Sequence, residues 1–232
     1  MKINDLKKYF EELEIPHTDE QIHQLEVLMY STLEQNQKFN LTAITDEDAF
    51  VEKMILDSAI ALKDLDLDGK KVIDIGTGAG FPGMVIRILS NADVTLLDST
   101  KKKIDYLLDY SMNNNLSVKG ISLRAEDYAR QQQETFDYAF ARAVSSLNIL
   151  LEIIMPLVKV GGYFVALKGA GYEEEINSSK EAFKKLNCHV ESIYETTLPE
   201  CEEKRAIIRI KKDKPTNKKY PRQYSDIKNR PL

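Results

Sequence analysis

The chain has 232 residues, of which 43% are hydrophobic and 30% are charged. These proportions exclude a collagen-like, low-complexity or wholly disordered protein, and they predict one full core with a small extension. The formal net charge is −5, yet eleven of the 32 Lys and Arg residues lie in residues 204–232 beside two acidic residues. The negative net charge of the whole chain argues weakly against nucleic acid as a partner, whereas the basic C-terminal end is a candidate phosphate-binding segment.

Neither export nor a membrane span is expected. The N-terminal residues MKINDLKKYFEELE carry charges where a signal peptide has an apolar stretch, and the longest apolar run is interrupted by Glu152 and Pro156. Two cysteines, Cys188 and Cys201, cannot form a multi-bridge framework. We therefore expect a cytoplasmic protein, and no group of residues has the spacing of a metal site.

Residues 1–68 are predicted to form an N-terminal helical extension. Apolar residues recur at near-helical spacing at Ile22, Leu25, Leu28, Met29 and Leu33. The run 45–48, Thr-Asp-Glu-Asp, resembles a capping box, and it predicts a helix that continues to about residue 62. No strand pattern interrupts this part of the chain.

From residue 69 to 211 short apolar runs alternate with helical segments. The predicted strands are 71–75, 94–98, 121–123, 136–140, 163–167, 189–194 and 205–210, and the predicted helices are 82–90, 100–114, 146–157 and 172–187. This alternation predicts an α/β fold with a mostly parallel seven-stranded sheet and helices on both faces. The last two strands are expected to form an antiparallel edge, followed by a basic tail over residues 212–232.

A glycine-rich turn follows the first predicted strand. Gly76, Gly78, Gly80 and Gly83 lie within eight residues after Asp74, which is near the end of that strand. Glycines remove the Cβ atoms where a strand-to-helix turn must let a ligand approach the backbone. Since ligands of open parallel sheets bind at the carboxyl ends of the strands, we expect a binding crevice there.

Two ligands fit this turn. The segment 78–83 matches the dinucleotide pattern G-x-G-x-x-G, with Asp98 twenty residues on. S-adenosylmethionine has no phosphate and carries a sulfonium cation, so an acidic residue beside the glycines favours it; the series Asp74-x-Gly76-x-Gly78 fits this ligand better. Asp98 suits either ligand because a carboxylate can accept both ribose hydroxyls, although it could instead cap the following helix.

Several further blocks carry a resemblance to a known family. They are Asn40–Thr45, Leu56–Ser58, Val72–Gly83, Leu97–Ser99, Arg124–Glu126, Ala141–Ala143, Leu167–Gly169 and Tyr220–Arg222. With these blocks the chain resembles the Rossmann-like class I methyltransferases. It is more closely similar to the bacterial RsmG family, also called glucose-inhibited division protein B, which methylates N7 of a guanine in small-subunit ribosomal RNA.

The resemblance implies a set of site residues. The cofactor S-adenosyl-L-methionine is expected to contact Asp74, Gly76, Gly78, Phe81, Asp98, Ala125, Glu126 and Arg142. In this set Gly76 and Phe81 line the methionine and sulfonium side, Ala125 and Glu126 lie against adenine, and Arg142 stands beside the cofactor. Asn40, Lys168 and Arg222 are the expected substrate-binding residues.

Arg142 has a separate rationale from the residues alone. It interrupts a small apolar series at a predicted strand end, where a buried arginine needs a carboxylate or phosphate partner. The chain also departs from the family pattern at Met54, where members usually carry His, and in the ending after Gln223.

The partner is expected to be the small ribosomal subunit and its 16S ribosomal RNA. The tail supplies candidate phosphate contacts at Lys211, Lys212, Lys214, Lys218 and Lys219, with Tyr220 and Tyr224 as candidate stacking surfaces. No catalytic acid or base is assigned, because guanine N7 has a free lone pair and no proton to lose. A nucleotide-dependent oxidoreductase and a noncatalytic ribosome-assembly module remain as alternatives.

Overall fold

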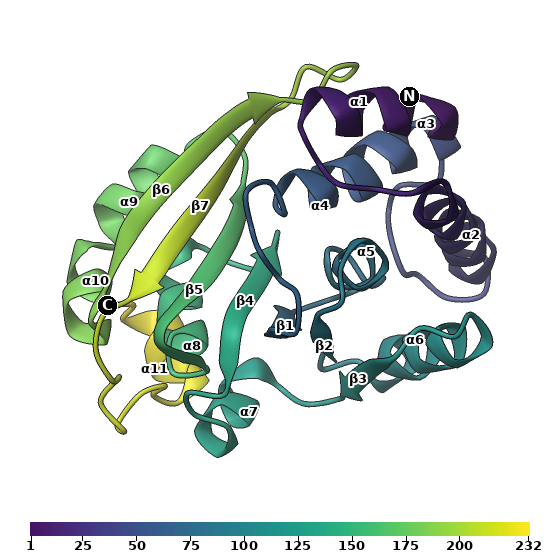
Figure 1. The fold of residues 1–232 in the computed structure, drawn as a ribbon. Coiled ribbons are helices and arrows are strands. Elements are labelled where there is room, and N and C mark those ends of the chain that lie inside the picture. Colours follow the sequence, from purple (N-terminus) through teal and green to yellow (C-terminus); the bar gives the residue numbers. More distant parts are fainter.

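Seven strands form one sheet in the computed structural model, which describes residues 1–232 (Figure 1). The strands are β1 (Lys71–Ile75), β2 (Asp93–Leu97), β3 (Val118–Ile121), β4 (Phe136–Arg142), β5 (Val158–Lys168), β6 (Cys188–Thr197) and β7 (Lys204–Lys212). Their order is β3-β2-β1-β4-β5-β7-β6. The first five are parallel to one another, and β7 is antiparallel to both β5 and β6. The predicted α/β class, the strand count and the antiparallel edge are confirmed.

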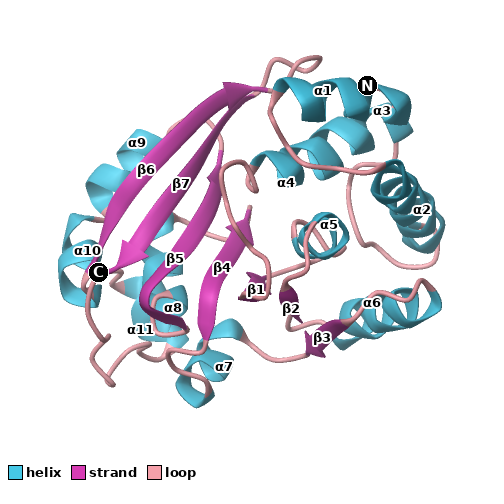
Figure 2. Cartoon of the chain, viewed as in Figure 1, coloured by secondary structure: helices cyan, strands magenta, loops and turns pink.

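Helices surround this sheet (Figure 2). The N-terminal part contains η1 (Ile3–Asp5), α1 (Leu6–Glu12), α2 (Asp19–Asn36), α3 (Glu47–Phe50), the π-helical segment η2 (Val51–Leu56) and α4 (Asp57–Ile60). The remaining helices are α5 (Gly83–Leu89), α6 (Lys101–Asn113), α7 (Ala125–Gln131), α8 (Leu147–Ile154), α9 (Tyr172–Ser178), α10 (Lys180–Leu186) and α11 (Tyr224–Asn229). None of them is long and apolar enough to pass through a bilayer.

Side chains that alternate along the strands build two cores, one on each face of the sheet. One face carries Val72, Val94, Leu96, Phe140, Val165, Leu167 and Ile207. The other carries Ile73, Ile75, Leu97, Ala139, Ala141, Phe164, Ala166, Ile208 and Ile210. Because both faces of the central strands are buried, these strands read as continuous apolar runs, which is why they were predictable.

The N-terminal helices pack on the first of these faces. Leu25 and Leu28 of α2 and Phe50 of α3 are fully buried in the same cluster as Val85 of α5 and Leu107 of α6. Figure 1 shows α1, α2 and α3 at the upper right, with α4 leading from them toward the sheet. The helical extension therefore brings α4 and η2 to the carboxyl ends of the strands.

Several local predictions were incomplete or wrong. The third strand lies at 118–121 and shares only Ile121 with the predicted 121–123, because Gly120 breaks the apolar pattern. That glycine is needed where α6 packs closely, since a Cβ there would lie 2.7 Å from Ile104 Cγ2. The predicted helix 172–187 is divided at Ser179, and α7 and α11 were not predicted.

The start of the helix after residue 45 is fixed by Asp46. Its side chain accepts a hydrogen bond of 2.8 Å from the amide of Ala49, so the N-cap is Asp46 and the capping box expected to begin at Thr45 is wrong. Beyond Phe50 the chain continues through the π-helical segment η2, a widened turn that is often found at functional sites. The predicted helix thus exists, but not as one regular α-helix.

Candidate functional site

The turn after β1 has the backbone conformation that only glycine adopts without strain. Gly76, Gly78 and Gly80 have φ values of +71°, +59° and +98°. A Cβ on Gly76 would lie 2.7 Å from Val144 Cγ2, so the turn also needs glycine for close approach to the segment after β4. The prediction of a backbone-exposing turn at this strand end is confirmed.

Six of the seven backbone N–H groups between Gly76 and Gly83 already donate within the protein, and only that of Ala79 has no acceptor. The amides of Gly76 and Thr77 donate to Leu97 O, and those of Gly80 and Phe81 donate to Thr77 O. The amide of Gly78 donates to Asp98 Oδ2, and that of Gly83 donates to Asp74 Oδ2. The acceptors lie inside the turn, on β1 or at the end of β2. The turn is therefore a preformed cradle rather than an array of free donors for an anion.

Asp74 lies beneath the turn. Its side chain belongs to the face of β1 that packs on α5, and Oδ2 accepts bonds from Thr77 Oγ1 at 2.6 Å and from the amide of Gly83 at 2.8 Å. Only 1% of the residue is exposed, and it lines neither cavity described below. Oδ1 is buried without a protein hydrogen-bond partner. Burial raises the pKa of Asp74 to about 6, against the two hydrogen bonds that lower it.

This raised pKa predicts a pH-dependent stability difference between the wild type and Asp74→Asn. The folded protein holds the Asp74 proton more tightly than the unfolded chain, whose pKa is 3.8, so stability is lost as pH rises from about 4 to beyond 6. The wild type should lose about 3 kcal/mol relative to Asp74→Asn between pH 4 and pH 8. Urea unfolding of both proteins across this range measures the difference, and a gap that stays constant would contradict it.

Asp98, at the end of β2, is bonded to two backbone segments. Its Oδ2 accepts from the amide of Gly78 at 3.1 Å, and its Oδ1 accepts from the amide of Thr100 at 2.8 Å, just before α6. The side chain is also part of a cavity wall. A carboxylate has about four acceptor positions, so these two bonds leave capacity for ribose hydroxyls.

Two cavities meet at the carboxyl ends of the strands. The larger has a volume of about 720 Å³ and the smaller about 330 Å³. Both are lined by Gly76 and by residues 142–145, which run between them. Ala143 in this segment has φ +52°, a conformation that costs a non-glycine residue free energy and is common at ligand sites. The crevice therefore extends across the glycine turn, as expected for an elongated ligand.

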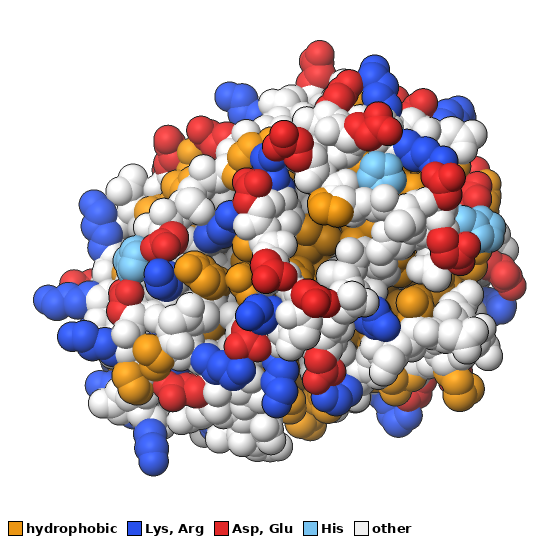
Figure 3. All heavy atoms as spheres, viewed as in Figure 1, with side chains coloured by type: hydrophobic (Ala, Val, Ile, Leu, Met, Phe, Trp, Pro, Cys, Tyr) orange, Lys and Arg blue, Asp and Glu red, His pale blue; other side chains and the backbone are white.

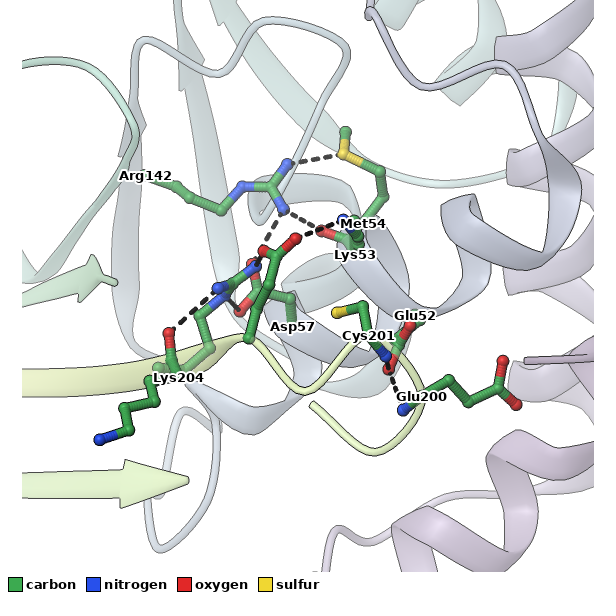
Figure 4. A network of polar contacts seen from close by, with 10 residues as sticks. Glu52, Lys53, Met54, Asp57, Arg142, Glu200, Cys201 and Lys204 are labelled. Carbon is green, nitrogen blue, oxygen red and sulfur yellow. Dashed lines mark hydrogen bonds and ion pairs between the residues drawn. The ribbon is translucent and has the colours of Figure 1, made fainter. Parts of the chain in front are cut away.

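An ion-pair network forms the floor of the larger cavity (Figure 4). Arg142, the last residue of β4, donates from Nη1 to Lys53 O at 2.7 Å and lies 3.4 Å from Asp57 Oδ2. Asp57 Oδ1 accepts from Arg205 Nε at 3.0 Å. The expected carboxylate partner of Arg142 is thus Asp57 of α4. Burial raises the pKa of Asp57, and the two guanidinium groups oppose that rise.

Met54 takes part in the same network. Its Sδ lies 3.0 Å from Arg142 Nη2, on the segment η2 that also supplies the Lys53 carbonyl (Figure 4). A thioether is a weak hydrogen-bond acceptor that does not take up a proton near neutral pH. At this position the chain therefore contributes to positioning Arg142 and has no group that could act as a base.

Two further ion pairs lie on the cavity wall. Lys168 Nζ, on a side chain that is 10% exposed, lies 2.7 Å from Glu175 Oε2 and donates to Ser145 O at 2.8 Å. Lys53 is paired with Glu203, which also accepts from Arg205. The wall thus carries paired charges of both signs. Lys168 lies at the crevice as expected, but it is held by protein groups.

The smaller cavity is lined by apolar residues of β1, β2 and α8 and by residues after β3. Ala125 and Glu126, the residues expected at the adenine, belong to its wall. Glu126 is 6% exposed and accepts from Arg124 Nε at 3.0 Å. Tyr224, from the C-terminal segment, completes the lining.

Of the three remaining expected residues, only Phe81 lines a cavity. Asn40 is exposed and precedes Leu41 and Thr42, which line the larger cavity. Phe81 lines that cavity and packs edge-to-face on Phe50, with ring centroids 5.4 Å apart. Arg222 lines neither cavity.

The tail lysines differ in exposure. Lys214, Lys218 and Lys219 are exposed, and Figure 3 shows Lys and Arg side chains gathered at the left edge, near the end of the chain marked C in Figure 1. Lys212 is different: its side chain is fully buried, and Nζ donates to Met155 O at 2.9 Å and to Val158 O at 2.8 Å. The prediction that Lys212 contacts phosphate is wrong because its ammonium group serves backbone carbonyls. Tyr220, 4% exposed, is likewise no stacking surface.

Replacing Lys212 by alanine is expected to destabilise the fold by about 2 kcal/mol, because two buried carbonyl groups lose their donor. The KM for the RNA substrate that the sequence predicts should not change, because Lys212 is fully buried. Lys214→Ala, at an exposed position, is the matched control and should leave stability within about 0.5 kcal/mol of the wild type. Chemical denaturation and steady-state kinetics test both statements, and a Lys212→Ala protein of unchanged stability would refute the first.

Several residues of the site were not predicted. Asp57, Arg205, Val144 and Glu175 all line the larger cavity. Asp57 had a detectable signal, since it is an acidic residue between apolar positions of a predicted helix. Arg205 and Glu175 had none, because ordinary surface residues of a strand and a helix look the same in sequence.

The strand order, the glycine turn after β1 and the joined cavities at the strand ends together define a Rossmann-like methyltransferase. A solved methyltransferase from Pyrococcus furiosus has the same architecture, with a TM-score of 0.54 and 17% sequence identity over 82% of this chain and 98% of that one. At this identity the likeness concerns the fold.

Sequence comparison gives the family. Residues 21–208 match GidB, the rRNA small subunit methyltransferase G family. The ribosomal RNA small subunit methyltransferase G of Thermoanaerobacter pseudethanolicus is 44% identical over 207 residues, which cover 86% of this chain and 85% of that protein. The protein of that name from Clostridium botulinum type A is 38% identical over 99% of this chain and 98% of its own length. This chain belongs to the methyltransferase G family, and the resemblance inferred from its motifs is confirmed.

Proposed function

We propose that this protein transfers the methyl group of S-adenosylmethionine to N7 of a guanine in the 16S RNA of the small ribosomal subunit. The family supports the reaction type and the RNA class. The geometry of the crevice supports the donor, and the chemistry of the acceptor atom fits the groups that line the larger cavity.

The observation that carries the choice of cofactor is the use of the backbone amides in the glycine turn. A dinucleotide needs free amide groups at its pyrophosphate. In this turn every amide except that of Ala79 donates to Leu97 O, Asp98, Asp74 or Thr77 O, so an array of free donors is lacking. Two carboxylates at the turn also repel phosphate, whereas they suit a ligand with a sulfonium and an ammonium group. These features favour S-adenosylmethionine over the dinucleotide of an oxidoreductase.

The residues divide between the two ends of the cofactor. Gly76 and Gly78 allow it to approach the backbone, Asp98 accepts ribose hydroxyls, and Ala125 and Glu126 line the adenine end. Phe81 borders the larger cavity, where the methionine end lies. Arg142 lies between the two ends and lines both cavities. Asp74 acts on the cofactor indirectly, because its hydrogen bonds from Thr77 and Gly83 fix the glycine turn.

The bound donor supplies an electrophilic methyl group on sulfur. The protein aligns the acceptor with it, and guanine N7 forms the new C–N bond with its lone pair while the S–C bond breaks, so no proton has to be removed. The purine becomes cationic as the bond forms. Asp57, Glu175 and Glu203 on the cavity wall are each paired with a lysine or an arginine, so none of them is assigned to stabilise this charge.

Substrate contacts are assigned from exposure. Asn40 is exposed and precedes Leu41, which lines the larger cavity, and Lys168 lies on the wall of that cavity. The exposed Lys214, Lys218 and Lys219 supply sequence-independent phosphate contacts farther away. Arg222 is given a different role below.

Tritiated methyl transfer tests the proposal. Subunits from cells that lack this modification are incubated with labelled donor, and the RNA is cleaved at N7-methylguanine by borohydride and aniline. Incorporation at one guanine is expected, and labelled RNA that resists cleavage would refute N7 as the acceptor. A noncatalytic assembly module would bind subunits without incorporation.

A further inference from the structure

The C-terminal segment 220–232 is folded against the body of the protein. Ile227 of α11 is fully buried in the core that α8 also helps to form. Arg222 forms a double ion pair with Glu152 of α8, with Nε–Oε1 and Nη2–Oε2 distances of 2.8 and 2.6 Å. The Glu152 side chain is completely buried. A buried carboxylate needs such a partner, so the pair fixes the segment.

Helix α7 holds the same segment from a second side. Arg130 Nη2 donates to Arg222 O at 2.7 Å, and Arg222 Nη2 donates to Arg230 O at 2.9 Å. Just after α7, Gln133 Nε2 donates to Tyr220 O at 3.4 Å. Figure 1 shows α11, in yellow, beside α8 below the long strands. The segment is therefore not a free basic arm.

Tyr224 begins α11 and reaches the smaller cavity. It lines that cavity together with Asp98 and Ser99 after β2 and with Ala125 and Glu126 after β3. The guanidinium carbon of Arg124 lies 4.7 Å from the centre of the Tyr224 ring, and Arg124 is itself held by Glu126. The aromatic ring is thus fixed in position at the end of the cavity assigned to adenine.

We propose that the C-terminal segment is part of the cofactor pocket: Tyr224 contacts the adenine of the bound cofactor, and the Glu152–Arg222 pair positions Tyr224. The inference rests on the proposed function. An aromatic ring packs on a purine by stacking, whichever hydrogen bonds the purine makes elsewhere. Tyr224 is therefore a cofactor-binding residue and Arg222 is a positioning residue, rather than contacts to RNA.

The test measures cofactor and RNA separately. Calorimetry with S-adenosylhomocysteine should show roughly ten- to hundredfold weaker binding for Tyr224→Ala and near wild-type binding for Tyr224→Phe, which keeps the ring. The KM for S-adenosylmethionine should rise in the same proportion in Tyr224→Ala, while the KM for ribosomal subunits stays unchanged. Lys228→Ala, an exposed change on the same helix, is the control.

Glu152→Gln tests the positioning role. This variant keeps both Arg222 and Tyr224, and it should nevertheless weaken the binding of S-adenosylhomocysteine, because Arg222 has lost its charged partner. Circular dichroism checks that the variant is folded. Wild-type binding by Tyr224→Ala, or a rise confined to the KM for subunits, would overturn the inference and leave the proposed function intact. If the wild-type protein itself binds no S-adenosylhomocysteine, the proposed function fails instead.

Discussion

Replacing Asp57 by alanine is expected to lower the free energy of unfolding by about 3–5 kcal/mol, because it leaves two guanidinium groups without their shared carboxylate. Asp57 is 4% exposed, and it lies between Arg142 at 3.4 Å and Arg205 at 3.0 Å. Both arginine side chains are only 15% exposed, so water can replace little of the lost interaction. Urea denaturation measures the loss.

Two further variants test whether the loss of stability comes from the missing carboxylate and not from substitution in general. Asp57→Asn keeps an acceptor at nearly the same volume and should cost less than alanine. Asp109→Ala, at an exposed position on α6, should stay within about 0.5 kcal/mol of the wild type. If Asp57→Ala cost less than about 1 kcal/mol, the network would not be the buried ion-pair system seen in Figure 4.

Gly76→Ala is expected to reduce kcat/KM for the methyl donor about 100-fold. Two causes combine: the residue has φ +71°, and the new Cβ would meet Val144 at 2.7 Å inside the crevice. A displacement of the turn misaligns the donor and the acceptor, and misplacement by about 1 Å is enough for a loss of this size. Steady-state methylation kinetics with varied donor concentration measure it.

The matched control is Gly69→Ala. Gly69 has φ +64°, but its Cβ would meet nothing within 4 Å, so this variant carries similar backbone strain away from the crevice. Its methylation kinetics should be unchanged. The double variant Gly76→Ala, Val144→Ala should recover part of the activity, since the three heavy atoms nearest to the new Cβ all belong to Val144. Equal losses in Gly69→Ala and Gly76→Ala would exclude a specific role for the turn.

The fold was largely predictable because the central strands are buried on both faces. Val72, Ile73, Ile75 and the glycines that follow give a strong local pattern. The errors lie where local pattern and packing disagree. The edge strand β3 contains Gly120, which is there because α6 packs against it, and that requirement is invisible in a single short segment.

The site residues that lie at the carboxyl ends of the parallel strands were predictable. Gly76, Asp98 and Arg142 follow three neighbouring strands, so parallel topology brings them together. Asp57 and Tyr224 reach the crevice from the two ends of the chain, and their place depends on how the extension and the tail fold back. The burial of Lys212 shows the same limit, since a buried and an exposed lysine look alike in sequence.

A crystal structure with S-adenosylhomocysteine bound is the most direct test of the crevice as a methyl-donor site. We expect the adenine in the smaller cavity between Ala125 and Tyr224, the ribose hydroxyls on Asp98 and the sulfur at Gly76, facing the larger cavity. Density for the ligand outside these two cavities, or a dinucleotide with its pyrophosphate on the glycine turn in a parallel soak, would contradict that assignment.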